Sequence, residues 1–250
     1  MKIAICHISE QGRQIAGKLR HSLEDCEIFD LRGKGLVSRW TSENFHRFDG
    51  LIYIMSLGIV YRVIAPHITD KYNDPAVVVI DDAARFSIAA LSGHEGGANR
   101  LSARAAAITG AVPVVTTASE TNRKVILGVG CRKGIGAKAV RDAVTTVLDE
   151  AELQPGDVRL AVSADIKREE KGLIEAFEAM DIPLIFLDSR DIAGTGRYKN
   201  VSEAAMRQLG LPGVAEPCAL LGGRGTTLIM ERQVQDGVTV ALAREDDDER

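Results

Sequence analysis

The sequence predicts an α/β protein with an N-terminal open, mainly parallel sheet domain and a C-terminal α/β domain with a mixed sheet. Apolar runs typical of strands alternate with segments of helical periodicity along the 250 residues. A polar stretch at 118–124 interrupts this alternation near its middle. Two strand-like runs around Asp236–Gly237 form a hairpin signal close to the end. We therefore place the domains at 1–120 and 121–244 and expect a disordered acidic tail at 245–250.

In the first domain, strands and helices follow one another in a regular order. Apolar residues recur at helical spacing between Gly12 and Leu23, and Pro66 is expected to end a short helix near 59–64. A further helix at 98–108 stops at Gly110. The expected strands are the apolar runs 2–8, 26–31, 50–56, 76–81 and 112–117. Several are apolar at nearly every position, which is typical of a parallel sheet covered on both faces.

The second domain repeats this alternation and then departs from it. Helices are expected near 137–151 and 169–180. The expected strands are 125–131, 158–164, 182–187, 226–232 and 238–244. Because the last two are joined by a tight turn, they must be antiparallel, and the sheet becomes mixed.

The composition excludes several classes of protein. The net charge of −4 equals that of the tail, whose residues 245–250 hold five acids and one base, so the remainder is neutral and nucleic-acid binding is not expected. Apolar runs such as 77–80 are too short to span a bilayer, and the N-terminus lacks the features of a signal peptide. The four cysteines contain no CxxC pair, so neither a disulfide framework nor a metal site is expected. We expect a cytoplasmic protein, for which a homodimer is compatible with the sequence.

Ligands of open α/β sheets bind outside the carboxyl ends of the strands, so residues at strand ends are the candidates for a site. The first domain offers Gly58 after the strand at 50–56, Arg62 one helical turn later, and the segment 92–99. The second offers residues that follow its first two strands. The candidates in the second domain are Gly130, Cys131, Arg132, Lys133, Asp165, Lys167 and Glu170.

The segment LSGHEGGANRLS, at 91–102, carries the most distinctive pattern. Its histidine, His94, titrates near neutral pH without perturbation, and flanking glycines let a backbone approach a bulky ligand. The N–H groups at the start of the following helix are candidates to bind an oxyanion. Alternatively, the glycines only build a turn, and His94 or Asn99 satisfies local backbone groups. Both interpretations stay open. The residues of this segment that we assign to a site are Ser92, Gly93, His94, Gly96, Gly97 and Asn99.

The candidates of the second domain also have a structural alternative. Asp165, Lys167 and Glu170 are spaced for an ion-pair cluster with no role in catalysis. Cations next to Cys131 would lower the pKa of its thiol, but without a histidine partner in the sequence an inert thiol is favoured. The glycine-rich turn at 128–137 offers backbone N–H groups to an anion such as a carboxylate.

Several segments together resemble the cobalt-precorrin 5A hydrolase family of cobalamin biosynthesis (CbiG). They are GLIYIMSLGIVYRVIAP, DKYNDPAVVVID, LSGHEGGANRLS and ITGAVPVVTTAS in the first half, and LGVGCRKG, SADIKREEKGL and GVAEPCALL in the second. The resemblance covers nearly the whole chain in the expected order. The chain departs from it by lacking a middle region, since Ala118 is followed almost directly by Val125, and by carrying Glu95 where the family is commonly apolar.

The resemblance implies hydrolysis of a δ-lactone on a cobalt-bound corrin intermediate, with loss of acetaldehyde. The cobalt then belongs to the substrate, and no protein cofactor or metal is implied. We expect the substrate between the two domains, with His94 activating water and Asp165 or Lys167 moving protons in the later step. A carboxylate-fringed macrocycle needs cations and N–H groups at its edge, for which Arg62, Arg132, Lys133 and Lys167 are candidates. A non-catalytic carrier or partner protein of the same pathway is the alternative.

Overall fold

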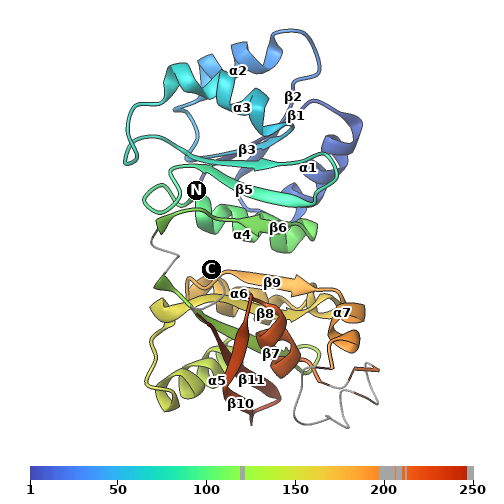
Figure 1. Cartoon of the computed structure of the whole chain (residues 1–250). Helices are drawn as coiled ribbons and strands as arrows, with labels where there is room; N and C mark the ends of the chain where they lie inside the picture. Colours follow the sequence, from blue (N-terminus) through green and yellow to red (C-terminus); the bar gives the residue numbers. More distant parts are fainter. Residues whose placement is uncertain (119–121, 197–205, 207–209, 212, 247–250) are drawn as a thin grey trace. The chain divides into compact units, whose positions relative to one another are not determined.

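The computed structural model describes residues 1–118, 122–196, 206, 210–211 and 213–246. The chain forms two compact units, Met1–Thr117 and Ala118–Arg250, each with its own sheet (Figure 1). Among the described residues, no helix is long and apolar enough to cross a membrane.

Unit 1 is a six-stranded sheet with helices on both faces (Figure 1). Its strand order is β2-β1-β3-β4-β5-β6. The elements are β1 (Ile3–His7), α1 (Glu10–Ser22), β2 (Cys26–Asp30), α2 (Leu36–Asn44), β3 (Gly50–Ile54), α3 (Leu57–Ile64), the short 3-10 helix Ala65–His67, β4 (Ala76–Ile80), β5 (Phe86–Leu91), α4 (Ala98–Thr109) and β6 (Val112–Val114). Helices α1 and α4 pack on one face, and α2 and α3 on the other. The mainly parallel sheet is therefore confirmed, while α2 was not expected and β6 is shorter than the run at 112–117.

One strand of unit 1, β5, runs against its neighbour β4, with Val79 opposite Ile88 and Ile80 opposite Ser87. The turn before it explains this direction. The Asp81 carboxylate accepts hydrogen bonds from the backbone N–H groups of Arg85 and Phe86, both at 2.8 Å. A connection this short closes a hairpin, whereas a parallel crossover needs a dozen or more residues. The carboxyl end of β5 consequently lies at the sheet edge opposite to the carboxyl ends of β1, β3 and β4.

Unit 2 is a five-stranded mixed sheet with the order β10-β11-β7-β8-β9. Its elements are β7 (Val125–Cys131), α5 (Ala137–Glu150), the 3-10 helices Pro155–Asp157 and Asp165–Lys167, β8 (Val158–Ala164), α6 (Lys171–Ala179), β9 (Leu184–Leu187), α7 (Ser189–Gly194), α9 (Ala215–Leu221), β10 (Thr226–Gln235) and β11 (Val238–Glu245). Strands β7, β8 and β9 are parallel, and β10 and β11 form the expected hairpin. Positive φ angles of 50° at Asp236 and 83° at Gly237 match its turn. The mixed sheet is confirmed.

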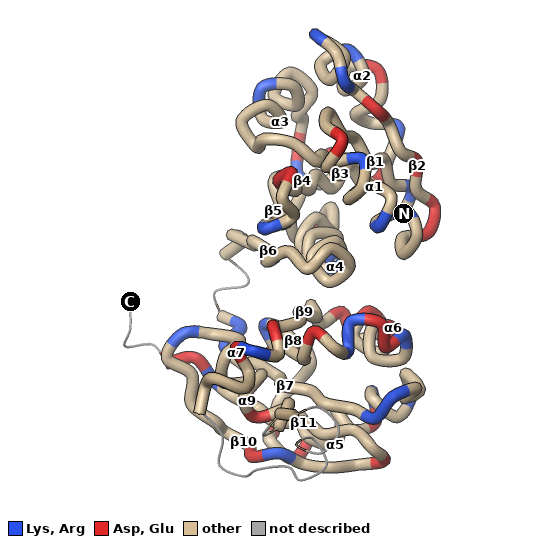
Figure 2. The backbone as a smooth tube through the Cα atoms, turned by 90° about the vertical axis from the view of Figure 1, so that its right-hand side faces the viewer, with Lys and Arg blue, Asp and Glu red and all other residues tan. Residues whose placement is uncertain are grey.

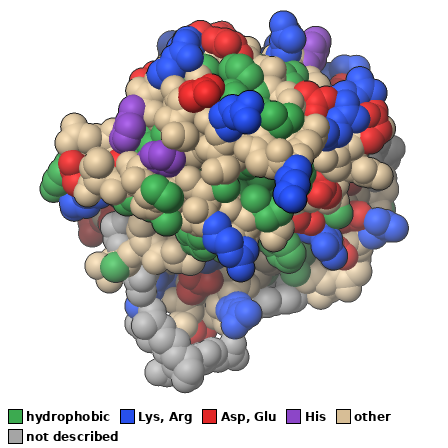
Figure 3. Space-filling model, turned by 90° about the horizontal axis from the view of Figure 1, so that it is seen from above, with side chains coloured by type: hydrophobic (Ala, Val, Ile, Leu, Met, Phe, Trp, Pro, Cys, Tyr) green, Lys and Arg blue, Asp and Glu red, His purple; other side chains and the backbone are tan. Residues whose placement is uncertain are grey.

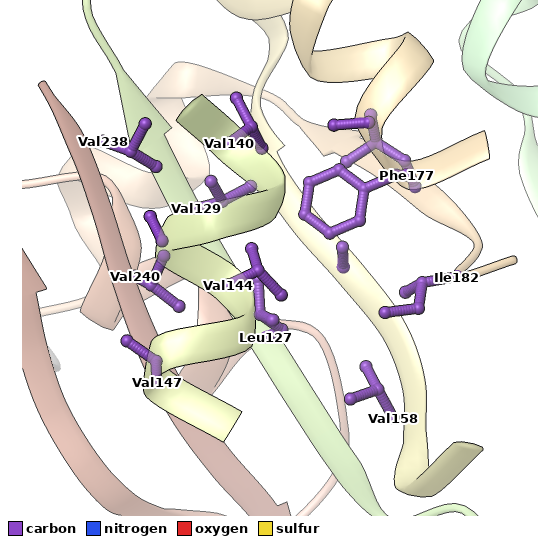
Figure 4. Packing of buried hydrophobic residues seen from close by; sticks show 14 of the residues in the cluster. Leu127, Val129, Val140, Val144, Val147, Val158, Phe177, Ile182, Val238 and Val240 are labelled. Carbon is purple, nitrogen blue, oxygen red and sulfur yellow. The ribbon is translucent and has the colours of Figure 1, made fainter. Parts of the chain in front are cut away.

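Aliphatic side chains from α5 and the strands make the larger core of unit 2. Val140, Val144 and Val147 point from α5 toward Leu127 and Val129 of β7, and Phe177 of α6 closes the same layer (Figure 4). Helix α9 covers the opposite face of β7, where the absence of a side chain on Gly128 lets the Ala215 carbonyl approach. Both faces of the central strand are therefore covered, as its uninterrupted apolar run predicts.

The last residues separate into an ordered and an undescribed part. Glu245, which the sequence analysis assigned to the tail, is the end of β11, and its carboxylate lies 3.1 Å from the Arg159 guanidinium. The boundary at 245 was therefore placed too early, because this pair and the strand ladder hold Glu245. Residues 247–250 lie outside the described residues.

Charged residues of both signs are distributed over the described parts of both units. Basic and acidic positions are interspersed along the described backbone, mainly in helices and loops (Figure 2). On the face of unit 1 that carries α2 and α3, hydrophobic side chains are scattered among charged ones (Figure 3).

Candidate functional site

The segment 92–97 forms a tight loop between β5 and α4. Ser92 adopts a left-handed conformation with φ of 54°, and Gly97 has φ of 84°. A side chain at Gly96 would meet the Ser92 Cβ at 2.4 Å, and one at Gly93 would meet the Asn99 side chain at 2.7 Å. These glycines are therefore required by the packing of the loop itself. For Gly93 and Gly96 the structure therefore supports the interpretation that they build a turn.

The start of α4 does not offer all the N–H groups that the sequence suggested. The Ala98 N–H donates to the Ser92 carbonyl at 3.1 Å, and the Asn99 N–H donates to the Gly93 carbonyl at 2.9 Å. The expectation that the helix terminus is open to an oxyanion is wrong for these two groups, because the loop folds back onto them.

Two side-chain oxygens beside this loop are buried and unsatisfied. Among the residues that the structure describes, Ser92 Oγ and Asn99 Oδ1 have no hydrogen-bond partner, although Asn99 Nδ2 donates to Thr117 Oγ1 at 2.9 Å. Leaving a buried polar atom unpaired costs about 1–3 kcal/mol. Strain at Ser92 adds to that cost, and such features cluster at ligand-binding sites. His94 is exposed on the same loop and is not enclosed by aliphatic side chains.

A second loop, 68–75, lies against this one. The buried Asp74 carboxylate accepts from the Thr69 N–H and hydroxyl at 3.0 and 2.8 Å, and a side chain at Gly96 would lie 3.4 Å from the Asp74 carbonyl. Lys71 Nζ donates to Glu95 Oε1 at 2.8 Å, which joins the two loops. This hydrogen bond is the main cause that lowers the pKa of Glu95. Glu95 is therefore an ionised partner of Lys71 near neutral pH.

The structure separates two sets of candidates in unit 1. Gly58 and Arg62 lie beyond the carboxyl end of β3, where Arg62 Nη1 donates to the Gly58 carbonyl at 2.9 Å. The loop with His94 lies at the opposite edge of the sheet, because β5 is antiparallel to β4. The expectation that both sets share one edge is wrong. Loop 92–97 is instead joined by Thr117 and Lys71, neither of which the sequence analysis selected.

In unit 2, the parallel strands bring three of the seven expected residues together, namely Cys131, Lys167 and Glu170. Lys167 Nζ lies 3.8 Å from Glu170 Oε1, and both side chains are nearly buried, with 10% and 14% exposed. The Gly134 N–H donates to Glu170 Oε2 at 2.9 Å. The glutamate thus binds the glycine-rich turn after β7 to the residues after β8, and its carboxylate occupies the Gly134 N–H that an external anion would use.

The Cys131 thiol is part of this cluster. Burial raises its pKa to about 11, against a smaller lowering by the Lys167 ammonium, and the Glu170 carboxylate raises it further. The thiol is therefore protonated near neutral pH, as the inert-thiol interpretation predicts.

Asp165 follows β8, and its carboxylate accepts a hydrogen bond from the hydroxyl of Ser189, the first residue of α7 after β9. The Ile166 N–H donates to the same carboxylate at 2.8 Å. Ser189 also lies at a strand end, so the strand-end rule would have found it if it had been applied to the third parallel strand.

The remaining candidates of unit 2 lie apart from the cluster. Arg132 is exposed and packs at the hairpin turn, where its N–H donates to the Gly237 carbonyl at 2.9 Å. Lys133 is exposed as well. Gly130 is buried within β7, and a side chain there would meet Val214 at 3.2 Å. Its expected place at an open strand end is therefore wrong, because α9 covers this face.

No group of three or more histidine, cysteine, aspartate or glutamate side chains is arranged to hold a metal ion within the described ranges. In unit 1, loop 92–97 exposes the His94 imidazole to solvent. In unit 2 the arrangement presents a carboxylate, an ammonium and a hydroxyl at adjacent strand ends.

Comparison with known families identifies both halves of the chain. Residues 39–120 match the family described as Cobalamin synthesis G N-terminal, and residues 125–243 match the one described as Cobalamin synthesis G C-terminus. The two matches leave only four residues between them, so the expected absence of a middle region is consistent with them.

Individual relatives agree with this assignment. A cobalt-precorrin-5A hydrolase of Priestia megaterium is 23% identical over 352 residues, with 96% of this chain and 94% of the relative covered. Because that alignment is longer than this chain, the relative contains a segment that is missing here. A cobalt-precorrin-5A hydrolase of Salmonella typhimurium is 50% identical over 78 residues, covering 31% of this chain and 22% of the relative. Protein CobE of a Sinorhizobium species is 36% identical over 120 residues, covering 47% of this chain and 78% of the relative.

Proposed function

The chain belongs to the cobalamin synthesis G (CbiG) family, and on this premise we propose that it is a cobalt-precorrin 5A hydrolase. In this reaction the enzyme opens a δ-lactone and releases acetaldehyde. The names of relatives that align along almost the whole chain support the proposal. The cobalt enters with the substrate, so the protein has only to bind and orient the macrocycle and move protons.

The loop 92–97 is proposed to carry the hydrolytic step. His94 takes a proton from water as the water oxygen attacks the lactone carbonyl carbon. Among the described residues the buried Ser92 hydroxyl has no partner, and we propose that loop 92–97 shifts when the substrate binds, so that this hydroxyl donates to the developing oxyanion in place of the occupied helix N–H groups. The ring C–O bond then breaks, and the proton held by His94 passes to the departing oxygen.

The later step is assigned to unit 2. The Asp165 carboxylate takes the proton of the newly formed hydroxyl, so that its oxygen forms the carbonyl of acetaldehyde, and the Lys167 ammonium supplies a proton to the macrocycle. The electrons of the broken C–C bond remain on the macrocycle. The hydrogen-bonded position of the Asp165 carboxylate next to Ser189 supports this role.

The location of the protein in the cell and its partners are also proposals. We propose a cytoplasmic location, since all four cysteines are free. A homodimer and the absence of a nucleic-acid partner remain predictions, which sedimentation velocity and a filter-binding assay would test.

The single observation that carries the proposal is the pair of unsatisfied buried oxygens beside His94, Ser92 Oγ in loop 92–97 and Asn99 Oδ1 in the first turn of α4. The test measures acetaldehyde released from the lactone intermediate. The variant His94→Ala should lower kcat by about 10²–10⁴-fold and recover partly with added imidazole. Ser92→Ala should lower kcat by about 10²-fold. The exposed His46 supplies the control His46→Ala, which should retain wild-type turnover.

Full turnover by His94→Ala would remove the assignment of the base. A carrier or partner protein is the alternative function. Such a protein would bind the intermediate and release no acetaldehyde, so the wild-type assay distinguishes the two functions directly.

A further inference from the structure

A hydrogen-bonded turn next to the His94 loop presents an aromatic ring and an ammonium group to solvent. The Asp70 carboxylate accepts from the N–H groups of Tyr72 and Asn73 at 2.8 and 3.1 Å. Together with the buried Asp74 carboxylate, it fixes the backbone of this turn. The Tyr72 side chain remains 72% exposed, more than any other large hydrophobic residue described.

Lys71 is held between this ring and the His94 loop. Its Nζ lies 4.8 Å from the centroid of the Tyr72 ring and 2.8 Å from Glu95 Oε1. The ion pair is open to solvent, with 59% of the Lys71 side chain and 33% of the Glu95 side chain exposed. Exposed pairs of this kind contribute about 0–1 kcal/mol. Lys71 can therefore exchange Glu95 for another carboxylate at little cost.

From this geometry we propose that Lys71 and Tyr72 form a binding subsite for a flat ring with carboxylate groups at its edge. The phenol ring of Tyr72 stacks on the ring face, and the Lys71 ammonium leaves Glu95 to bind a peripheral carboxylate. Glu95 competes with the ligand for Lys71. The inference rests on the proposed function for the identity of the ligand, and both residues are positioning residues that do not touch the reacting atoms.

The test measures binding by titration calorimetry with cobyrinic acid, a corrin with free carboxylates, and with its uncharged heptamethyl ester. Lys71→Met should weaken binding of the acid about fivefold and leave binding of the ester unchanged. Tyr72→Ala should weaken binding of both ligands about tenfold. Glu95→Gln should tighten binding of the acid about threefold, because it removes the competing carboxylate.

Lys34→Met is the matched control. Lys34 is an exposed lysine beyond the carboxyl end of β2, at the sheet edge opposite to the His94 loop, so its loss should change neither affinity. In turnover of the lactone, Lys71→Met and Tyr72→Ala should raise KM and leave kcat unchanged.

The outcomes separate this inference from the proposed function. If the wild-type protein releases acetaldehyde but Lys71→Met and Tyr72→Ala bind cobyrinic acid as tightly as wild type, the subsite is overturned and the proposed function stands. If Glu95→Gln weakens binding of cobyrinic acid, the proposal that Lys71 leaves Glu95 to bind a carboxylate of the ligand is overturned. A wild-type protein that neither binds the acid nor releases acetaldehyde contradicts both proposals.

Discussion

Each unit places one lysine–glutamate pair beside its candidate residues, and the two pairs differ in burial. In unit 1, Lys71 and Glu95 come from two loops and meet at 2.8 Å with 59% and 33% of their side chains exposed. In unit 2, Lys167 and Glu170 lie three residues apart at 3.8 Å, with 10% and 14% exposed. The same two residue types therefore experience very different dielectric surroundings.

The difference assigns different roles to the pairs. Water screens the exposed pair, so its partners are free to exchange with a ligand. The buried pair is linked to the Gly134 N–H and surrounds the Cys131 thiol, so removing either charge leaves the other desolvated. We therefore expect a binding role for the first pair, and for the second a structural role in addition to any proton transfer.

The largest effect should come from breaking the buried pair. Lys167→Met should lower the free energy of unfolding of unit 2 by about 3 kcal/mol, because it leaves Glu170 buried without its counterion. Lys71→Met should change that of unit 1 by less than about 0.5 kcal/mol. Urea denaturation followed by far-UV circular dichroism measures both. Equal losses of unfolding free energy in Lys167→Met and Lys71→Met would contradict the assignment of a structural role to the buried pair alone.

The single tryptophan makes this measurement specific to one unit. Trp40 lies on α2, so its fluorescence reports the unfolding of unit 1 alone. Lys167→Met should therefore move the circular dichroism transition and leave the fluorescence transition in place. A fluorescence transition that moves equally would show that the units unfold together.

A smaller effect is expected from the glycine that lets α6 approach the turn after β7. A side chain at Gly172 would lie 2.0 Å from the Ile135 carbonyl oxygen. Gly172→Ala should therefore displace α6, separate Glu170 from Gly134, and cost about 1–3 kcal/mol of stability. Gly17→Ala is the control, since Gly17 lies within α1 with no atom within 4 Å of the added carbon. Gly17→Ala should raise the free energy of unfolding of unit 1 by about 0.5–1 kcal/mol.

The denaturant midpoints of Gly172→Ala and Gly17→Ala, compared with that of the wild type, measure these two changes in stability. A Gly172→Ala variant as stable as wild type would show that α6 adjusts without strain. The cluster would then be less constrained than the buried pair suggests.

The smallest effect concerns the pH dependence of unit 2. The folded pKa of Cys131, about 11, is above the ordinary thiol value of 9.0. The protonated thiol therefore favours the folded state fully below pH 9, and this contribution is lost as the pH rises toward 11. Alkylation of Cys131, followed by peptide mass spectrometry, should accelerate up to about pH 11. Glu170→Gln should shift the profile to lower pH and Lys167→Met to higher pH.

A profile that neither substitution moves would place both charges too far from the thiol to act on it. The half-buried Cys26 is an internal reference in the same experiment, because burial raises the pKa of its thiol and neither residue of the Lys167–Glu170 pair contributes.

The site residues of unit 2 were easier to predict from sequence than those of unit 1. Strands β7 and β8 are parallel, so residues after their carboxyl ends meet at one edge, and Cys131, Lys167 and Glu170 do so. In unit 1 the same rule failed for the His94 loop, because β5 reverses direction. Asp81 and Asp82 are typical turn residues, and a connection as short as this one requires β5 to run antiparallel to β4.

Other residues gave too weak a signal to be selected. Tyr72 and Lys71 lie in a polar turn, and an exposed aromatic residue in such a turn has no periodicity that marks it. Helix α2 was missed because it is short and its buried positions include the polar Thr41 and Asn44, so its hydrophobic stripe is incomplete.

The sequence by itself determined the alternation of strands and helices, the hairpin at Asp236–Gly237 and the family, because these depend on local periodicity, turn chemistry and short motifs. Only the tertiary structure decided which side chains surround His94. The partners Lys71 and Glu95 are 24 positions apart, and Asn99 and Thr117 are 18 apart. Contacts over such separations depend on the direction of each strand in the sheet, and for β5 the hydrogen bonds of the Asp81 turn set that direction.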